Sequence, residues 1–176
     1  HYLVHLAAST GMNSLDPAKF RENYESVQLI CKLCQGRESL KKIVFTSSLL
    51  VCRNGYIPLF DSDYCPPNGY GHSKAISEIV VKDSALSVPW CIVRPTSIWG
   101  PWFEGGYSRF FWLISKRLYF NISGDEIMKP TSYVGNTCHM IYKLMTSEER
   151  NKTYYLADYP QSSVQEWANI IHDVYG

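Results

Sequence analysis

The sequence predicts an α/β fold with a doubly wound parallel sheet, covered by helices on both faces. Apolar, β-branched runs alternate with segments whose apolar residues recur at helical spacing. Small or polar residues end the first three apolar runs, at Ala7-Ala8, Ser47-Ser48 and Pro95–Ser97. Ligands of parallel sheets bind at the carboxyl ends of the strands, so these residues predict a shared site.

The expected elements follow one another along the first hundred residues. Strands are expected at 1–8, 42–52 and 90–98, and helices at 17–35 and 70–85. The first helix is expected to start after Asp16-Pro17, because proline is tolerated in a first turn, and to stop at Gly36. Residues 53–69 are rich in Asn, Gly, Pro and Asp, which predicts a long loop.

The pattern changes beyond residue 100. The aromatic segment 104–120 predicts helix in part, and its rings favour core packing over a sugar-binding platform. A turn is expected at Ser123-Gly124-Asp125. The remaining expected elements are a helix at 136–145, a strand at 153–157, and a helix opened by the capping box Ser163-Val-Gln-Glu166.

Composition favours a cytoplasmic protein with one substantial core. The 176 residues are 45% hydrophobic and carry a formal net charge of +1. No block of like charge indicates a nucleic-acid or membrane partner, and every apolar run is too short to span a bilayer. The residues after His1 do not have the pattern of a signal peptide.

The cysteines are predicted to be reduced, buried thiols. A chain of this size and apolar content can form a core without disulfides. The six cysteines are at positions 31, 34, 52, 65, 91 and 138. Cys31 and Cys34 form a CxxC pair on a predicted helix, without a second pair or a nearby histidine, so core packing is favoured there. We expect no metal site.

Tyr70 and Lys74 form the most informative pair in the chain. Four residues apart on a helix, they face the same side, and Ser48 at the end of a neighbouring strand could complete a proton-transfer group. A tyrosine has a pKa near 10 and is a poor base at neutral pH. A nearby ammonium group stabilises the phenolate, so Lys74 is expected to lower the pKa of Tyr70.

The spacing alone is weak support, because a chain with 13 tyrosines contains such a pair by chance about as often as not. A surface helix pair is the simpler interpretation. The order of the motifs changes this balance. The chain has, in this order, a strand that ends in Ser-Ser, a loop, the helix with Tyr70 and Lys74, and a strand that ends in Arg94-Pro95.

This order resembles the extended short-chain dehydrogenases/reductases, in particular the branch of NAD-dependent nucleotide-sugar epimerases and dehydratases. The matching segments cover nearly the whole chain in the expected order. They are His5-Leu-Ala-Ala8, Asn23, Phe45-Thr-Ser-Ser48, Tyr70-Gly-x-Ser-Lys74 with Glu78, Arg94-Pro-x-x-x-x-Gly-Pro101 and Tyr133-Val134.

The resemblance implies a Rossmann-type sheet, bound NAD (with NADP as the alternative) and a nucleotide-sugar substrate. It makes Tyr70 the catalytic base, Lys74 the residue that binds the nicotinamide ribose, and Ser48 a contact to the sugar oxygen. The residues implied in cofactor binding are Ala7, Ala8, Ser47, Tyr70, Lys74 and Pro95, and those in substrate binding are Ser48, Ser97 and Lys129. Asn23 matches a helix asparagine of the family, but a purely structural role is equally compatible.

Some positions depart from the family. Dehydratases have two acidic residues after the catalytic hydroxyl, where this chain has Leu49 and Leu50, so a 4,6-dehydratase is not expected. Gly135-Asn136 replaces a common acidic pair, and Cys52 replaces a common tyrosine.

The family's first strand, glycine-rich turn and ribose-binding acid are missing. These elements hold the pyrophosphate at a helix N-terminus, so we expect the chain to be a fragment. The expected domains are a partial dinucleotide-binding domain at 1–100 and a small substrate-binding lobe at 101–176, with 131–158 as a segment that could return to the sheet.

Three functions follow as alternatives. The favoured one is an NAD-dependent epimerase that oxidises a nucleotide sugar transiently to a ketone. The second is an NADP(H)-dependent reductase or dehydrogenase of the same superfamily. The third is a non-catalytic fragment that cannot bind dinucleotide alone. The resemblance also implies a homodimer through helices 17–35 and 70–85.

Overall fold

The computed structural model describes residues 1–176 except 12–13, 104–105, 120–126 and 176. It forms two compact units, each described here by itself. The first unit comprises His1–Pro95 with His139–Leu156, and the second comprises Thr96–Cys138 with Ala157–Gly176.

The first unit contains a four-stranded parallel sheet, as the sequence predicts. Its strand order is β1-β2-β3-β6, and each neighbouring pair runs parallel. The strands are β1 (Tyr2–His5), β2 (Lys42–Thr46), β3 (Trp90–Pro95) and β6 (Lys152–Leu156). All carboxyl ends therefore lie at the same edge of the sheet, where ligands of such sheets bind.

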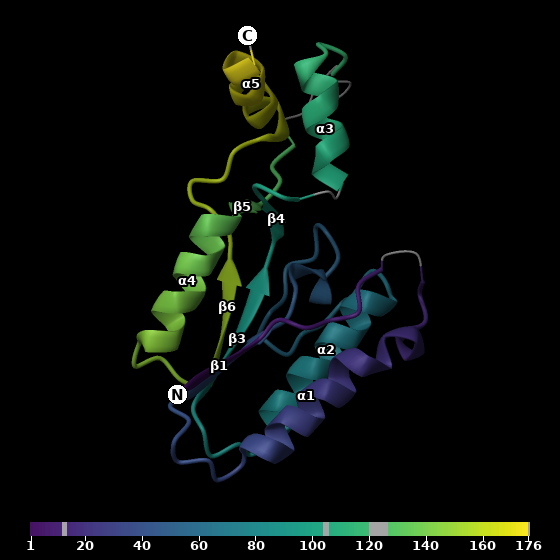
Figure 1. The fold of residues 1–176 in the computed structure, drawn as a ribbon. Coiled ribbons are helices and arrows are strands. Elements are labelled where there is room, and N and C mark those ends of the chain that lie inside the picture. Colours follow the sequence, from purple (N-terminus) through teal and green to yellow (C-terminus); the bar gives the residue numbers. More distant parts are fainter. Residues whose placement is uncertain (12–13, 104–105, 120–126, 176) are drawn as a thin grey trace. The chain divides into compact units, whose positions relative to one another are not determined.

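Helices pack on both faces of this sheet (Figure 1). Side chains alternate along a strand, so Ile43 and Phe45 of β2 face one side and Val44 the other. Ile43 and Phe45 share a core with α1 (Arg21–Cys34) and α2 (Gly69–Asp83). Val44 shares a core with the part of α4 (Val134–Thr146) that belongs to this unit. This arrangement accounts for the burial of all of β3 and of β2 up to Phe45.

Two strands are shorter than predicted. The expected strand 42–52 ends at Thr46, because the Ser48 side chain accepts a hydrogen bond from Leu50 N and caps the 3-10 helix η2 (Leu49–Val51). The expected strand 1–8 is confined to Tyr2–His5. Apolar content alone did not distinguish the strand from the turn that follows it.

The expected strand 90–98 divides between the two units. Trp90–Pro95 is β3, whereas Ser97–Trp99 forms β4, which pairs in parallel with β5 (Thr131–Tyr133) in the second unit. Thr96 lies at the boundary, and its hydroxyl donates a hydrogen bond to the Pro130 carbonyl.

The predicted start of the first helix is confirmed. The Asp16 carboxylate accepts a hydrogen bond from Ala18 N at 2.9 Å and caps the 3-10 helix η1 (Pro17–Phe20), which leads into α1. The chain leaves the helix after Cys34. Gly36 then adopts a φ of +70°, a left-handed conformation that favours glycine.

In the second unit, α3 (Gly106–Ser115) packs on α5 (Val164–Tyr175). Their aromatic rings form a core around Trp167, as predicted for this segment. The predicted capping box is confirmed, since Glu166 N donates to Ser163 Oγ and Ser163 N donates to Glu166 Oε2. The turn predicted at Ser123-Gly124-Asp125 lies outside the described residues.

Among the described residues, none of the helices is both long and apolar enough to cross a bilayer.

Candidate active site

The start of α2 positions Tyr70. Asn68 caps the helix by accepting a hydrogen bond from Gly71 N at 2.8 Å. Gly71 then packs directly on η2, where a Cβ atom would overlap the Leu50 carbonyl oxygen. The glycine therefore allows the first turn of α2 to approach the segment that carries Ser48.

Lys74 lies one turn further along α2 and is almost completely buried, at 3% exposure. Its Nζ donates a hydrogen bond to the Thr46 carbonyl oxygen at 2.9 Å and lies 5.9 Å from the centre of the Tyr70 ring. Burial lowers the pKa of Lys74 to about 8, and the negative charge of Glu78 opposes this change only in part. Lys74 is thus a cation that loses its proton more readily than an ordinary lysine, at mildly alkaline pH.

Tyr70 packs edge-on against Phe20, with ring centres 6.2 Å apart. Burial raises the pKa of its phenol, and the neighbouring Ser48 hydroxyl opposes the rise. The expected lowering by Lys74 is therefore wrong for the chain by itself. A buried phenolate loses hydration, and the Lys74 ammonium is directed to the Thr46 carbonyl.

The structure nevertheless brings the predicted triad together. Ser48 follows β2 and lies within hydrogen-bond reach of the Tyr70 hydroxyl on α2, and the Lys74 ammonium lies between the Tyr70 ring and the Thr46 carbonyl at the end of β2. All three residues belong to the first unit. The Ser48 oxygen accepts from Leu50 N at 3.1 Å, which leaves its O–H group able to donate. A phenol, an ammonium and a hydroxyl at one strand end can move a proton to or from a substrate oxygen.

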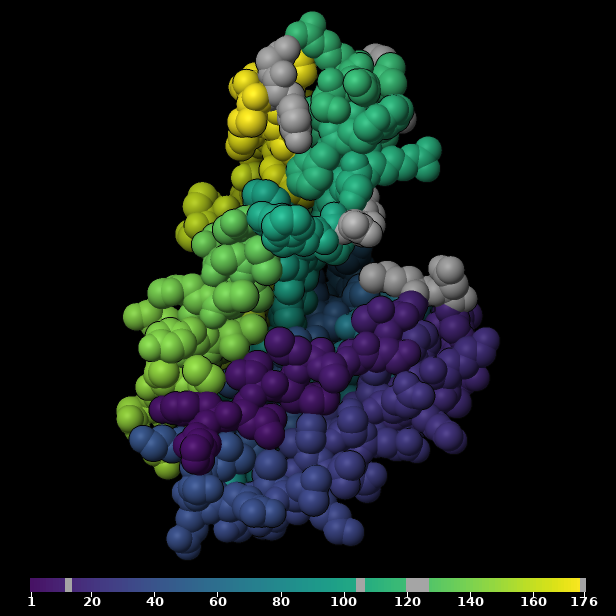
Figure 2. Space-filling view, viewed as in Figure 1, coloured from purple at the N-terminus to yellow at the C-terminus, as the bar shows by residue number. Residues whose placement is uncertain are grey.

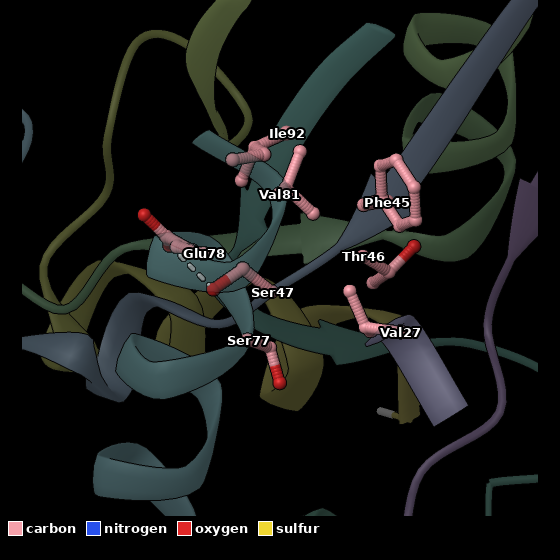
Figure 3. A pocket seen from close by; sticks show the side chains of 8 residues that line it. All are labelled: Val27, Phe45, Thr46, Ser47, Ser77, Glu78, Val81 and Ile92. Carbon is pink, nitrogen blue, oxygen red and sulfur yellow. Dashed lines mark hydrogen bonds between the residues drawn. The ribbon is translucent and has the colours of Figure 1, made fainter. Parts of the chain in front are cut away.

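A buried ion pair lies next to this triad. Arg94 of β3 donates to both carboxylate oxygens of Glu78, through Nε at 2.9 Å and Nη2 at 2.7 Å. Both residues are no more than 1% exposed. Ser47 also donates to Glu78, at 2.5 Å, as Figure 3 shows. The Ser47 side chain is thereby engaged in the protein interior, and its predicted contact with the cofactor stays a prediction.

The space beside Ser47 and Glu78 is too small for a cofactor. It has a volume of about 10 Å³, room for about one water molecule. Among the described residues, the Thr46 hydroxyl on its wall is buried without a hydrogen-bond partner (Figure 3). A single water in this space could satisfy that hydroxyl.

The other predicted cofactor contacts lie at strand ends of the first unit. Ala7 and Ala8 follow β1 and are exposed, and Figure 2 shows the N-terminal segment, in dark purple, on the surface of this unit. Pro95 is buried at the end of β3. The parallel registers place these positions along the edge that also carries Ser48.

Asn23 has the structural role that the sequence left open. It is 1% exposed, accepts from Ser9 N at 2.7 Å, and donates to Ser9 O and to Ser73 Oγ. It therefore connects the segment after β1 to α2 beside Lys74.

The two remaining predicted substrate contacts belong to the second unit. Ser97 lies in β4 opposite Thr131, and the Lys129 ammonium lies 5.0 Å from the centre of the Tyr107 ring. Their roles stay predictions.

Asp158 supplies a carboxylate where the sequence departs from the family. It accepts hydrogen bonds from Tyr133 N at 2.7 Å, Ser132 Oγ at 3.2 Å and Asn136 Nδ2 at 3.0 Å. The negative charge that is missing at Gly135-Asn136 therefore reaches the start of α4 from a different segment.

Comparison with known proteins identifies the family. Residues 1–129 match the sequence profile of an NAD-binding family described as "Male sterility protein". The chain belongs to this family. It is an extended short-chain dehydrogenase/reductase with part of a Rossmann domain. No curated protein matches the chain significantly in sequence.

Solved structures with a similar fold include several sugar epimerases. The UDP-N-acetylglucosamine 4-epimerase from Bacillus cereus superposes with a TM-score of 0.82 at 19% identity, over 99% of this chain and 62% of that one. The UDP-glucuronic acid 4-epimerase from the same organism, solved with NAD and UDP-glucuronic acid, gives 0.78 at 16% identity, over 98% and 59%. The ADP-L-glycero-D-manno-heptose-6-epimerase from Helicobacter pylori gives 0.79 at 20%, over 99% and 58%. The chain thus spans about three fifths of these relatives.

The residues of this short-chain dehydrogenase/reductase are compatible with one end of NAD. An ammonium has three N–H donors, and among the described residues the Lys74 group has Thr46 O as its acceptor. Two donors therefore remain for ribose hydroxyls. Tyr70 and Lys74 are the residues that would hold the nicotinamide ribose.

Sequence reasoning assigned no role to two groups near the triad. Glu78 was recognised only as part of a motif, although its position eight residues after Tyr70 on one helix face was a usable signal. His5 is buried at the end of β1 and close enough to Lys74 for that charge to contribute to its lowered pKa, after burial as the main cause. The pairing of β1 with β2 brings His5 near Lys74, and no pattern in the sequence indicates this position.

Proposed function

We propose that the chain is part of an NAD-dependent epimerase that acts on a nucleotide-activated sugar. The convergence of Ser48, Tyr70 and Lys74 at a strand end of an NAD-binding fold is the observation that carries this proposal. The folds of the sugar epimerases support it. Exposed Ala7 and Ala8, together with Pro95, would line the cofactor.

Each member of the triad has one role. Tyr70 takes the proton from a sugar hydroxyl as the carbonyl forms and returns it when the alcohol is restored. Ser48 donates a hydrogen bond to the same oxygen and holds it against the phenol. Lys74 binds the ribose hydroxyls, and its ammonium charge favours the phenolate form of Tyr70 when the cofactor is bound. NAD supplies the hydride acceptor and donor for this cycle.

Loss of water from the sugar is not part of the proposal. Leu49 and Leu50 occupy the positions after Ser48 and carry no group that moves a proton. Ser97 and Lys129 are the proposed substrate contacts, Lys129 because an ammonium can pair with a diphosphate.

A reductase is the second candidate, and the protonation of Tyr70 favours it. A phenol of ordinary pKa is already protonated at neutral pH, and burial raises the pKa of Tyr70 further, so Tyr70 is in the form that donates a proton to a carbonyl oxygen. Reduction of a ketone needs that form first. NADP(H) would then be a co-substrate and not a recycled cofactor.

One experiment separates these functions. The full-length protein is incubated with a panel of nucleotide sugars and, in parallel reactions, with NAD, NADP or NADPH. Products are identified by NMR while the absorbance of reduced cofactor is followed. An epimerised sugar without net change in reduced cofactor supports the epimerase. Stoichiometric consumption or formation of reduced cofactor overturns it in favour of the reductase. A Tyr70→Phe protein, inactive in either case, controls for contaminating enzymes.

A further inference from the structure

Cys52 and Cys65 are paired side by side outside the proposed active site, and the proposed catalytic roles do not involve them. They are bridge partners in a short parallel pairing at the two ends of the loop 53–64. Cys65 N donates to Val51 O at 3.0 Å, and Arg53 N donates to Cys65 O at 2.7 Å. Backbone bonds on both sides of Cys52 therefore fix its register opposite Cys65.

This register meets the Cα spacing that a disulfide requires. Paired strands lie about 4.8 Å apart, and side chains of directly opposed residues point to the same face of the pairing. Disulfides bridge Cα atoms about 4.4–6.8 Å apart. Cys52 and Cys65 can therefore be joined with little movement of the backbone.

Both sulfur atoms lie near the same phenol. The pKa of Tyr56 is raised to about 12, mainly by its hydrogen bond to Asp63, with further contributions from burial and from both cysteines. Cys52 packs in a small core beside Tyr56, and its thiol points to the Asp63 carbonyl at 3.4 Å. Cys65 is more exposed than Cys52 and is thus the thiol that an oxidant meets first.

We infer that Cys52 and Cys65 form a reversible oxidation site, which closes to a disulfide under a peroxide. The Cys65 thiolate attacks a peroxide oxygen, the O–O bond breaks, and a sulfenic acid forms while the departing hydroxide takes up a proton to become water. The Cys52 thiol then attacks the oxidised sulfur, forms the S–S bond and releases a second water. Two thiols are oxidised, hydrogen peroxide is reduced to water, and a dithiol reductant reverses the step.

The disulfide would link the two ends of the loop 53–64, which covers the buried ion pair of Arg94 and Glu78. The loop supplies Asp61 O, which accepts from Arg94 Nη2 at 2.6 Å, and leads to Tyr64, whose hydroxyl donates to Glu78 Oε2 at 3.0 Å. In the reduced protein this cover is held by noncovalent contacts alone. In the oxidised protein it cannot open at its ends, so amide exchange across 53–65 slows severalfold.

The other cysteines make a contrasting set. Cys31 and Cys34 lie on the buried face of α1, and burial raises the pKa of Cys31, which disfavours its reactive thiolate. Cys91 is buried in β3 and Cys138 is exposed on α4. The site is therefore expected to be specific for one pair.

The test uses the full chain with Cys138→Ser, which prevents cross-linking between molecules. The folded protein is treated with hydrogen peroxide, remaining thiols are alkylated, and non-reduced tryptic peptides are weighed by mass spectrometry. Trypsin cleaves after Arg53, so Cys52 and Cys65 separate into peptides 43–53 and 54–74. The expected product is these two peptides joined with the loss of two hydrogen atoms, and separated again by dithiothreitol.

The same digest shows the contradicting results. A Cys31–Cys34 disulfide would instead join peptides 22–32 and 33–37, because trypsin also cleaves after Lys32. That product in place of the 43–53/54–74 pair overturns the inference, and so do cysteines that are only alkylated or singly oxidised. Hydrogen exchange with and without peroxide gives a second readout, with the Cys52→Ser/Cys65→Ser protein as its control. Neither readout depends on catalysis, so the inference can fail while the proposed function holds.

Discussion

The hydroxyl of Tyr70 can be removed without removing the packing of its ring. In Tyr70→Phe, the edge-on contact with Phe20 remains, so the free energy of unfolding should change little. Turnover should be abolished, because the proton then has no donor or acceptor at the substrate oxygen. Steady-state kinetics and urea unfolding check the two parts. Tyr56→Phe, which removes a hydroxyl bonded to Asp63 instead, is the matched control and should stay active. A near-normal rate in Tyr70→Phe would exclude Tyr70 from the mechanism.

Lys74 should leave a signature in the pH dependence of stability. Its folded pKa of about 8 lies below the ordinary 10.5, so between these values the unfolded chain binds the extra proton. Stability from this group therefore increases as pH rises from about 8 to 10.5, by about 3 kcal/mol. Urea unfolding near neutral pH and near pH 10 should show this increase relative to Lys74→Met. Equal pH dependence in both proteins would contradict the buried, weakly basic state of Lys74.

The triad shows which residue properties were predictable from the sequence. The helical spacing was enough to predict that Tyr70 and Lys74 share one face. The Ser-Ser end of the strand was enough to predict that Ser48 lies near them. The direction of the Tyr70 pKa was not predictable, because it depends on burial against Phe20 and on the Thr46 carbonyl that engages Lys74. Both are contacts between elements.

At the scale of elements, Gly71 makes the contact between α2 and η2 possible. A methyl group there would overlap the Leu50 carbonyl oxygen, so Gly71→Ala should lower the free energy of unfolding by about 1–3 kcal/mol and displace Ser48 from Tyr70. Gly11→Ala is the matched control, because its Cβ would meet the Phe20 ring at an ordinary 3.5 Å. Urea unfolding compares the two proteins. Equal stability would mean that α2 does not depend on this close approach.

Glu78 joins α2 to the ends of β2 and β3. Glu78→Ala leaves the buried Arg94 guanidinium without its carboxylate, which should cost about 3–5 kcal/mol of stability. Glu149→Ala breaks an exposed ion pair with Lys152 and should have a much smaller effect. Chemical denaturation measures both. A similar loss in the two proteins would show that burial of the first pair has little energetic importance.

Element boundaries were less predictable than element types. The sequence correctly predicted the alternation of strands and helices, the helix start at Asp16 and the Ser163–Glu166 capping box. The strand from Lys42 was predicted too long because the apolar residues after Ser48 continue the β-like composition. A hydrogen bond from Leu50 N to Ser48 Oγ turns them into a 3-10 helix instead.

At the scale of the whole chain, the first unit contains groups for one end of a dinucleotide. Lys74 and Tyr70 can meet a ribose, but a pyrophosphate is usually held by backbone N–H groups at a helix N-terminus after a glycine-rich turn. The sequence of residues 1–176 contains no G-x-G-x-x-G motif of the kind that forms such a turn. When residues 1–176 bind NAD, the contribution of the phosphates to the binding free energy should therefore be absent.

Residues 1–176 alone should thus bind NAD only weakly, with a dissociation constant above about 1 μM, corresponding to less than about 8 kcal/mol of binding free energy. Isothermal titration calorimetry measures this directly, and Lys74→Met should weaken any remaining affinity because it removes the ribose donors. The comparison with a longer protein that carries a glycine-rich turn isolates the phosphate contribution. Sub-micromolar binding by 1–176 would mean that the strand ends around Ala7, Ala8 and Pro95 hold the phosphates without a helix N-terminus.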